Sequence, residues 1–171
     1  MHASLRTCCL TVVALSCCIG RVGEASEPVP GLPLAAAAAP MQSNCDGVKP
    51  ATTTLTGAES HVYRRASGRP LLLHVFRANG RNGPAPAILF FFGGGWRTGD
   101  VDSFADRAAE FAARGVAAIV VDYRVYCRDR TTAADALRDA QAAYAWTRQH
   151  ARALQVDPTR IVLSGGSAGG H

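Results

Sequence analysis

The sequence has a single lysine, Lys49, and its other 17 basic residues are arginines scattered along the chain. Only Arg64 and Arg65 are adjacent. A nucleic-acid-binding surface would cluster such residues and interleave them with aromatic side chains. The formal net charge of +5 therefore indicates a solvated basic surface, and we expect no nucleic-acid partner.

Motifs for metals and nucleotides are also absent. No group of cysteine, histidine and aspartate residues has the spacing of metal ligands, and neither a P-loop nor a G-x-G-x-x-G fingerprint occurs. We therefore expect no metal and no other cofactor. Apart from the amino-terminal stretch, there is no long apolar run and no internal repeat, so we expect one globular domain and no transmembrane span.

The amino terminus is typical of a secretory signal peptide, which we assign to residues 1–25. Arg6 supplies a positive charge, and the apolar stretch from Cys8 to Gly20 is too short to cross a bilayer comfortably. Small residues at Gly23 and Ala25 provide a cleavage site before Ser26. The protein is therefore predicted to be secreted or periplasmic.

Two alternatives for this terminus stay open. The first is a lipoprotein signal with a lipid on Cys17 or Cys18, although the preceding residues match a lipoprotein cleavage box poorly. The second is an apolar tail that is not cleaved. Cleavage as a signal peptide leaves Cys45 and Cys127 of the six cysteines. In an exported protein these two form one disulfide or stay as unpaired thiols, and the sequence does not choose between the two states.

Residues 26–50 are rich in proline and alanine and are predicted to be a linker. The domain is assigned to residues 51–171. It opens with two short β-like runs, 61–65 and 71–77, separated by a turn signal, which predicts an antiparallel hairpin. The uninterrupted apolar runs at 87–92 and 116–121 predict strands buried on both faces of a sheet.

Helical patterns separate the later strands. Ser103, with Asp106 three residues on, is predicted to cap a helix that ends at Gly115, and Thr132 is predicted to cap a longer helix with Asp135. The buried face of the longer helix is expected to carry Leu137, Ala140, Tyr144, Thr147, Ala151 and Leu154. A strand at 160–164 follows. This alternation predicts an α/β fold in which the hairpin precedes parallel βαβ units with helices on both faces of the sheet.

Two glycine-rich segments carry the chemistry. Gly93-Gly94-Gly95-Trp96 follows the strand at 87–92, and its backbone N–H groups are suited to stabilise an oxyanion. Gly165-Gly166-Ser167-Ala168-Gly169 is a G-x-S-x-G directly after the last strand, which is typical of a nucleophilic serine on a sharp turn. Together the two segments indicate acyl transfer through a serine.

With Asp122-Tyr123-Arg124, these segments resemble the α/β-hydrolase superfamily, and most closely its bacterial hormone-sensitive-lipase-like and acetyl-xylan- or feruloyl-esterase-like carboxylesterases. The resemblance covers residues 60–171, the amino-terminal half of that fold. It implies that Ser167 is the nucleophile and that the backbone N–H groups of Gly94, Gly95 and Ala168 form the oxyanion hole. Trp96 is expected to line the acyl pocket or to cover the sheet edge.

One residue departs from the pattern of these families. They usually carry a structural histidine before the glycines, and this chain has Phe92 there. The departure affects the expected loop geometry and substrate range more than the reaction class. The resemblance gives Asp122-Tyr123-Arg124 a mainly structural role.

In this fold the catalytic acid and histidine follow the serine, and only four residues follow Ser167. His171 lies on the nucleophile's own turn and is expected to face away from it. The other histidines of the domain precede the serine and are interpreted as surface or hairpin residues: His61, His74 and His150. We therefore expect an incomplete domain, an inactive chain as given, and an aggregation-prone open edge at strand 160–164.

The resemblance implies an exported serine esterase that acts on short-chain, acetyl-type esters of a carbohydrate or small alcohol, through an acyl-enzyme on Ser167. A serine peptidase of the prolyl-oligopeptidase type is an alternative, because it shares the Gly-Gly-Ser-Ala-Gly-Gly style of turn. A non-catalytic fragment or pseudoenzyme that only binds ligand is another. The sequence does not indicate an oligomeric state.

Overall fold

The computed structural model describes residues 45–171. The predicted signal peptide lies outside these described residues, as does the predicted linker except for its last part, 45–50. Within the described range, no helix is both long and apolar enough to cross a membrane.

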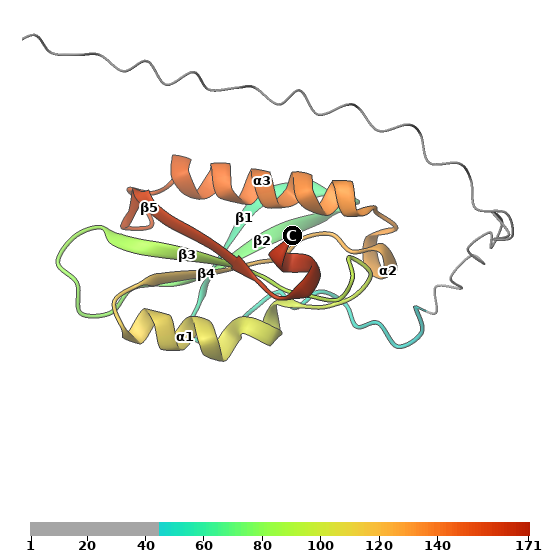
Figure 1. The fold of residues 1–171 in the computed structure, drawn as a ribbon, viewed down its shortest axis with the longest axis horizontal. Helices are drawn as coiled ribbons and strands as arrows, with labels where there is room; N and C mark the ends of the chain where they lie inside the picture. Colours follow the sequence, from blue (N-terminus) through green and yellow to red (C-terminus); the bar gives the residue numbers. More distant parts are fainter. Residues whose placement is uncertain (1–44) are drawn as a thin grey trace, which may run out of the picture. The chain divides into compact units, whose positions relative to one another are not determined.

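A five-stranded mixed sheet forms the centre of the domain (Figure 1). Its strands lie in the order β1-β2-β4-β3-β5. The hairpin of β1 and β2 is antiparallel, β2 pairs antiparallel with β4, and β3 runs parallel to both β4 and β5. The prediction of a hairpin followed by parallel units is confirmed. The strand bounds are β1 Glu59–Ala66, β2 Arg69–Phe76, β3 Ala85–Phe91, β4 Ala117–Val121 and β5 Val156–Gly165.

Helices cover both faces of this sheet, as predicted: α1 and α3 lie on opposite sides of it (Figure 1). The turn η1 and helix α1 connect β3 to β4, helices α2 and α3 connect β4 to β5, and the turn η2 follows β5. Their bounds are η1 Val101–Phe104, α1 Ala105–Ala113, α2 Tyr126–Asp129, α3 Ala133–Gln149 and η2 Ser167–Gly170.

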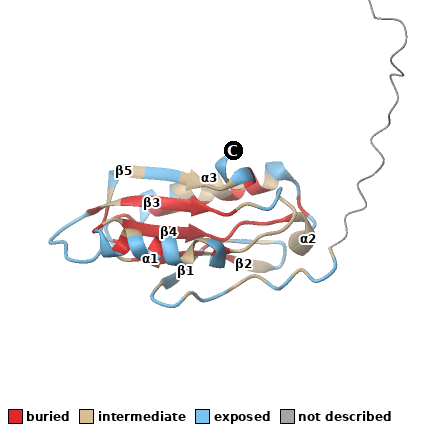
Figure 2. Ribbon diagram, turned by 60° about the horizontal axis from the view of Figure 1, so that its bottom comes forward, coloured by how far each residue is buried: buried red, intermediate tan, exposed pale blue. Residues whose placement is uncertain are grey.

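The two central parallel strands form the core. β3 and β4 are buried along their length (Figure 2), which explains why their sequences are apolar without alternation. Leu89 and Ile119 have no exposed surface, and each such side chain stabilises the fold by about 1.5–3 kcal/mol. On the α1 side, Phe90 stacks on Phe104 with ring centroids 5.0 Å apart. These strands are the rigid support for the loops at their carboxyl ends.

β5 lies at the edge of the sheet, as expected for this segment. Val162 and Leu163 are 58% and 55% exposed although they point to opposite faces of the strand. Figure 2 shows the contrast with the buried β3 beside it. The edge is therefore both apolar and uncovered within the described residues, the combination that favours self-association.

The predicted cap of the first helix is wrong. Asp100 begins the helical segment, because its carboxylate accepts the N–H of Val101 at 2.7 Å. Ser103 lies inside η1, and its hydroxyl donates to the carbonyl oxygen of Asp100 at 2.8 Å. The same carboxylate accepts the N–H and hydroxyl of Thr52 at 3.0 and 2.9 Å. The residue that caps this helix, Asp100, thus also binds Thr52, which lies 48 positions earlier in the sequence.

The predicted cap of α3 is confirmed, and the predicted face is right in part: Thr147 is buried, as are Ala151 and Leu154 beyond the end of the helix. Thr132 and Asp135 form the expected capping box. Leu137, which was expected to be buried, is 56% exposed. Asp139 points inward instead because its carboxylate is paired with Arg124 and Arg64. The residues that the helix buries are Ala136, Asp139, Ala143 and Thr147.

Cys45 and Cys127 form a disulfide, with Cα atoms 5.2 Å apart. This pairing decides between the two states that the sequence left open. Cys127 lies in α2, so residues 45–50 are attached to the domain across a sequence separation of 82 residues.

His74 on β2 gives the fold a predicted pH dependence. It is fully buried, and its Nδ1 lies 3.0 Å from the Ser60 hydroxyl. Burial lowers the pKa of His74, against the opposing effect of Asp100, so the folded protein binds this proton less readily than the unfolded chain does. The free energy of unfolding is therefore expected to fall as the pH drops below the ordinary histidine value of about 6.5.

Urea unfolding at about pH 7.5 and about pH 5.5 measures this loss. The difference between the two pH values should shrink in a His74→Gln variant. If the free energy of unfolding changed with pH as much in the variant as in the unmodified protein, the pH dependence would belong to other groups.

Candidate active site

The two glycine-rich segments meet at one end of the sheet. The loop at 93–99 follows β3, and the predicted nucleophile follows β5. These strands are parallel neighbours, with Phe91 opposite Gly165 in the register. The carboxyl ends of neighbouring parallel strands, where the strand order reverses, are where α/β sheets bind ligands. The topology therefore brings the predicted oxyanion loop to the predicted nucleophile.

Ser167 sits on a sharp turn between β5 and η2. Its φ is +50°, a left-handed value that is uncommon for residues other than glycine. The residue is exposed. Gly169 closes the turn by donating its N–H to the carbonyl oxygen of Gly166 at 2.9 Å. A Cβ atom on Gly169 would meet the carbonyl oxygens of Phe91 and Phe92, so only glycine lets this turn pack against β3.

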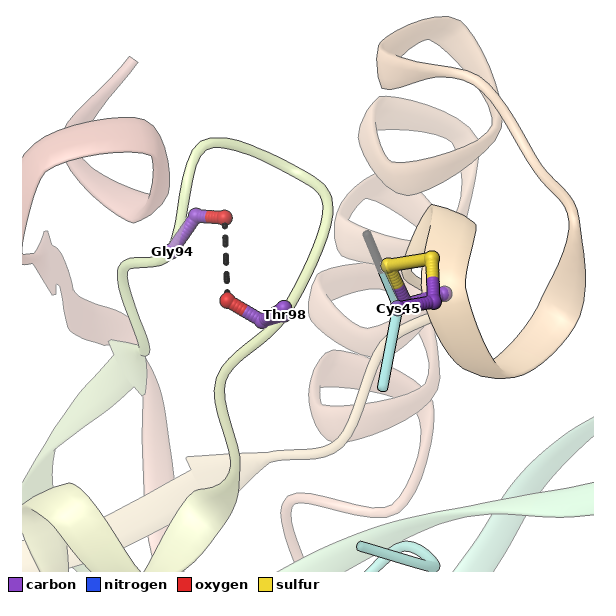
Figure 3. Close-up of a disulfide and its surroundings, with 4 residues drawn as sticks. Cys45, Gly94 and Thr98 are labelled. Carbon is purple, nitrogen blue, oxygen red and sulfur yellow. Dashed lines mark hydrogen bonds between the residues drawn. A yellow bond between two sulfur atoms is a disulfide. The ribbon is translucent and has the colours of Figure 1, made fainter. Parts of the chain in front are cut away.

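The loop at 93–99 folds back on the carbonyl oxygen of Gly94. This oxygen accepts the N–H groups of Arg97 and Thr98 at 3.0 and 3.1 Å, and the Thr98 hydroxyl lies 3.4 Å from it (Figure 3). Gly94 has a φ of +124°, and a Cβ there would collide with the Thr98 carbonyl. The tight turn thus requires glycine at this position.

Loop and turn are in close approach. A Cβ atom built on Gly93 would lie 3.4 Å from the Cβ of Ser167. The backbone N–H groups of Gly94, Gly95 and Ala168 have no hydrogen-bond acceptor among residues 45–171. An N–H without an acceptor is rare in a buried residue such as Ala168. The site thus offers unpaired donors beside the serine, while their binding of an oxyanion stays a prediction.

Residues 73–171 match the BD-FAE family. The chain belongs to the BD-FAE family. The match includes both glycine-rich segments and the strands that position them.

Lipases and esterases are among the named relatives of this BD-FAE chain. Lipase 2 of Moraxella sp. (strain TA144) is 46% identical over 85 residues, which are 49% of this chain and 19% of that protein. Esterase LipI of Mycobacterium tuberculosis (strain ATCC 25618 / H37Rv) is 39% identical over 87 residues, 50% of this chain and 27% of that protein. The chain therefore spans well under two thirds of the length of these curated relatives.

A solved structure shares the fold. Est2, a thermophilic esterase from the Planctomycetes species Thermogutta terrifontis, matches with 43% sequence identity and a TM-score of 0.65. The match covers 67% of this chain and 41% of Est2. The BD-FAE domain described here is thus part of an α/β-hydrolase esterase fold, as the sequence predicted.

Phe92 occupies the position where the families named by the resemblance usually have a histidine. Its ring stacks on Tyr123 with centroids 4.1 Å apart, and the Tyr123 hydroxyl donates to the carbonyl oxygen of Phe92. Burial raises the pKa of Tyr123 to about 12, so this hydroxyl remains a donor at neutral pH. A tyrosine that follows β4 therefore fixes the start of the glycine loop, which is the task expected of the absent histidine.

No histidine of the described residues reaches the hydroxyl of Ser167. The Nδ1 of His171 lies 3.1 Å from the carbonyl oxygen of Ser167, and its ring packs edge-on against Trp96 at 5.7 Å. His74 is buried on β2, and His150 stacks on Trp146 at the end of α3. The described residues therefore place no histidine base beside the predicted nucleophile.

Trp96 is half-buried and lines a cavity of about 570 Å³ between α3 and the end of β5. Leu137, Tyr144 and Leu163 form its apolar walls. Neither Ser167 nor the Gly94 position contributes to the lining. Ala168, Gly169 and Gly170 of the serine turn do line it, so the cavity adjoins the predicted nucleophile, and the place of Trp96 in an acyl pocket stays a prediction.

Sequence reasoning missed one element of this site, helix α2. Its N–H groups at Tyr126 and Cys127 each donate, at 2.9 Å, to the carbonyl oxygens of Trp96 and Arg97 in the glycine loop. Cys127 was the available signal, since a disulfide to Cys45 would hold the segment after β4 in one position.

Replacing Gly94 by alanine is expected to lower kcat for ester hydrolysis by roughly 10²–10³-fold, the cost of losing one oxyanion donor. The new Cβ would displace the Thr98 carbonyl and so tilt the loop. Steady-state kinetics of the whole protein measure this loss. Gly80→Ala is the matched control, because Gly80 also has a positive φ, +65°, but has open space around it. An equal loss of kcat in both variants would mean that backbone strain at a positive φ, and not the geometry of the glycine loop, is responsible.

Proposed function

We propose that the whole protein is an exported serine esterase that hydrolyses short-chain, acetyl-type esters of carbohydrates or small alcohols. The observation that carries the proposal is the exposed Ser167, held at a positive φ beside unpaired backbone N–H groups. Serine hydrolases of the α/β type place their nucleophile in this way. Membership of the BD-FAE family supports the same reaction class.

The proposed reaction proceeds through an acyl-enzyme. The hydroxyl oxygen of Ser167 attacks the ester carbonyl carbon, and the N–H groups of Gly94, Gly95 and Ala168 stabilise the negative charge that forms on the carbonyl oxygen. The alcohol leaves with the proton of the serine. Water then attacks the acyl group, releases the carboxylic acid and restores the serine.

The proposal assigns the proton transfers to a histidine, oriented by an acidic residue, outside residues 45–171. None of the described histidines faces the Ser167 hydroxyl. Residues 1–171 alone are therefore expected to hydrolyse esters only slowly. Fast hydrolysis by this polypeptide, lost in a Ser167→Ala variant, would contradict the assignment.

Short acyl groups are supported by similarity. Est2 has been solved with propionate and with butyrate bound, and it is 43% identical to this chain over the matched region. Export is supported by the disulfide, because such bonds persist in oxidising compartments. The amino-terminal residue of the protein recovered from its host would check the predicted cleavage before Ser26.

The test compares substrates of equal leaving group on the whole protein. We expect p-nitrophenyl acetate and butyrate to be hydrolysed faster than p-nitrophenyl esters of long acyl chains, and a peptide p-nitroanilide to be stable. Preference for the anilide would indicate a peptidase. Binding of the esters without turnover would indicate a protein that only binds ligand.

Labelling identifies the nucleophile independently of turnover. An organophosphate such as paraoxon, which phosphorylates Est2, is expected to add its phosphoryl group to the peptide that contains Ser167. Peptide mapping by mass spectrometry locates the label. A label on any other serine would overturn the assignment.

A further inference from the structure

Helix α2 and the segment that starts at Cys45 hold the glycine loop from outside the sheet. Figure 3 shows the disulfide beside the turn formed by Gly94 and Thr98. The disulfide joins Cys45 to Cys127 of α2. No step of the proposed reaction uses these cysteines, so their position beside the loop needs another explanation.

A short chain of contacts leads from the disulfide to the oxyanion loop. The N–H of Cys127 donates to the carbonyl oxygen of Arg97 at 2.9 Å, and the N–H of Arg97 donates to the carbonyl oxygen of Gly94 at 3.0 Å. The preceding N–H, of Tyr126, donates to the carbonyl oxygen of Trp96 at 2.9 Å. Any movement of α2 therefore shifts the peptide planes next to Gly94 and Gly95.

The far end of the loop is held by the same two segments. The guanidinium of Arg128, on α2, donates to the carbonyl oxygen of Gly99 at 2.6 Å. Thr52 binds the carboxylate of Asp100 through its N–H and its hydroxyl. Residues 45–52 therefore form a strap across the loop. Cys45 attaches it to α2, and Thr52 attaches it to Asp100, the residue that follows the loop.

Ion pairs also attach α2 to the rest of the domain, and in one of them Arg128 Nη2 lies 3.7 Å from Asp122 Oδ1. Arg69 donates from Nε to the carboxylate of Asp129 at 2.7 Å, and this carboxylate also accepts the N–H of Val125 at 3.0 Å. The helix has only four residues, too few to be stable by itself. These ion pairs keep α2 near the sheet when the disulfide opens, whereas the segment that starts at Cys45 loses its covalent link to α2.

We propose that the Cys45–Cys127 disulfide is a positioning device for the oxyanion loop, so that its reduction slows ester hydrolysis through kcat. The proposal rests on the proposed function for its effect on hydrolysis, though not for its effect on the loop. Reduction by dithiothreitol transfers two electrons and two protons to the sulfur pair, and gives two thiols and the cyclic oxidised reagent. Substrate contacts outside the loop are unchanged, so KM stays the same.

The first arm of the test is hydrogen exchange in the full chain, with and without dithiothreitol. The informative amides are those that carry the contacts, Arg97, Thr98 and Cys127. We expect them to exchange at least about tenfold faster after reduction, while the amides of β4 keep their protection. Unchanged exchange at the loop would show that the Arg69–Asp129 pair is sufficient and would overturn the proposal. An equal rise in β4 would show global loosening and would also overturn it.

The second arm is steady-state hydrolysis of p-nitrophenyl acetate. We expect kcat to fall by about tenfold on reduction, less than the loss of an oxyanion donor, and to recover on reoxidation. A Cys45→Ser/Cys127→Ser variant should have the lower kcat and should not respond to dithiothreitol. A rise in KM at constant kcat would contradict the positioning role. An oxidised protein without esterase activity would refute the proposed function, and the exchange arm would still decide on the strap.

Discussion

Replacing Ser167 by alanine is expected to lower kcat for p-nitrophenyl acetate by roughly 10⁴–10⁶-fold in the full chain. The variant keeps the N–H groups of Gly94, Gly95 and Ala168, so it retains binding and part of the oxyanion stabilisation. It loses the only group in the proposed mechanism that forms a bond with the acyl carbon. End-point assays of p-nitrophenol release by the purified protein measure the loss of kcat, and organophosphate labelling should be lost as well.

Ser164 supplies the matched control. It lies on β5 three residues before Ser167 and is half-buried. Ser164→Ala is expected to keep kcat within about twofold, since surface or partly buried substitutions away from the chemistry change little. A loss in Ser164→Ala equal to that in Ser167→Ala would move the cause from the nucleophile to the integrity of β5.

Local sequence predicts the parts of this site that local geometry determines. β3 and β4 are uninterrupted apolar runs because both of their faces are buried. Glycines appear where the backbone approaches another strand, as at Gly169. The capping box of Thr132 and Asp135 needs only residues three apart. From such features the sheet, the loop and the serine turn are predicted together.

Contacts between distant residues account for what local sequence does not predict. The cap of η1 is Asp100, whose carboxylate is also held by Thr52. The disulfide needs the fold to bring Cys45 to α2. The inward face of α3 follows from Asp139, a charged residue that helical periodicity assigns to solvent. Local sequence does not predict any of these contacts, because only the folded sheet brings the partners together.

Phe92 shows how such a distant partner changes the interpretation of a departure from a family pattern. The sequence alone suggested a less well-held loop. The stacking of Phe92 on Tyr123, and the hydrogen bond from the Tyr123 hydroxyl to the Phe92 carbonyl, fix the same peptide by other means. In this chain the carbonyl oxygen of Phe92 is thus held by Tyr123 without a histidine before the glycines.

The second large effect is expected in the free energy of unfolding, at Asp139. This carboxylate has no exposed surface. It accepts Arg124 Nε at 2.7 Å, Arg124 Nη2 at 2.9 Å and Arg64 Nη1 at 2.9 Å. It therefore joins α3 to β1 and to the segment after β4. Asp139→Ala is expected to destabilise the protein by about 3–5 kcal/mol, the usual cost of breaking a buried ion pair.

The cost arises because the arginines left behind are not equivalent. The side chain of Arg64 is 35% exposed and can turn its charge to water. That of Arg124 is 10% exposed, and its remaining carboxylate neighbour, Asp135, is 3.8 Å away. A double variant, Asp139→Ala with Arg124→Met, should therefore recover part of the loss, since it removes the buried charge that lacks a partner.

Urea unfolding of the two variants and of Asp106→Ala tests this explanation. Asp106 lies exposed in the first turn of α1, and its removal is expected to cost no more than about 1 kcal/mol. Recovery in the double variant would show that the stranded arginine, and not the cavity left by the carboxylate, causes the loss. A double variant less stable than Asp139→Ala would instead show that Arg124 stabilises the segment after β4 through its apolar packing.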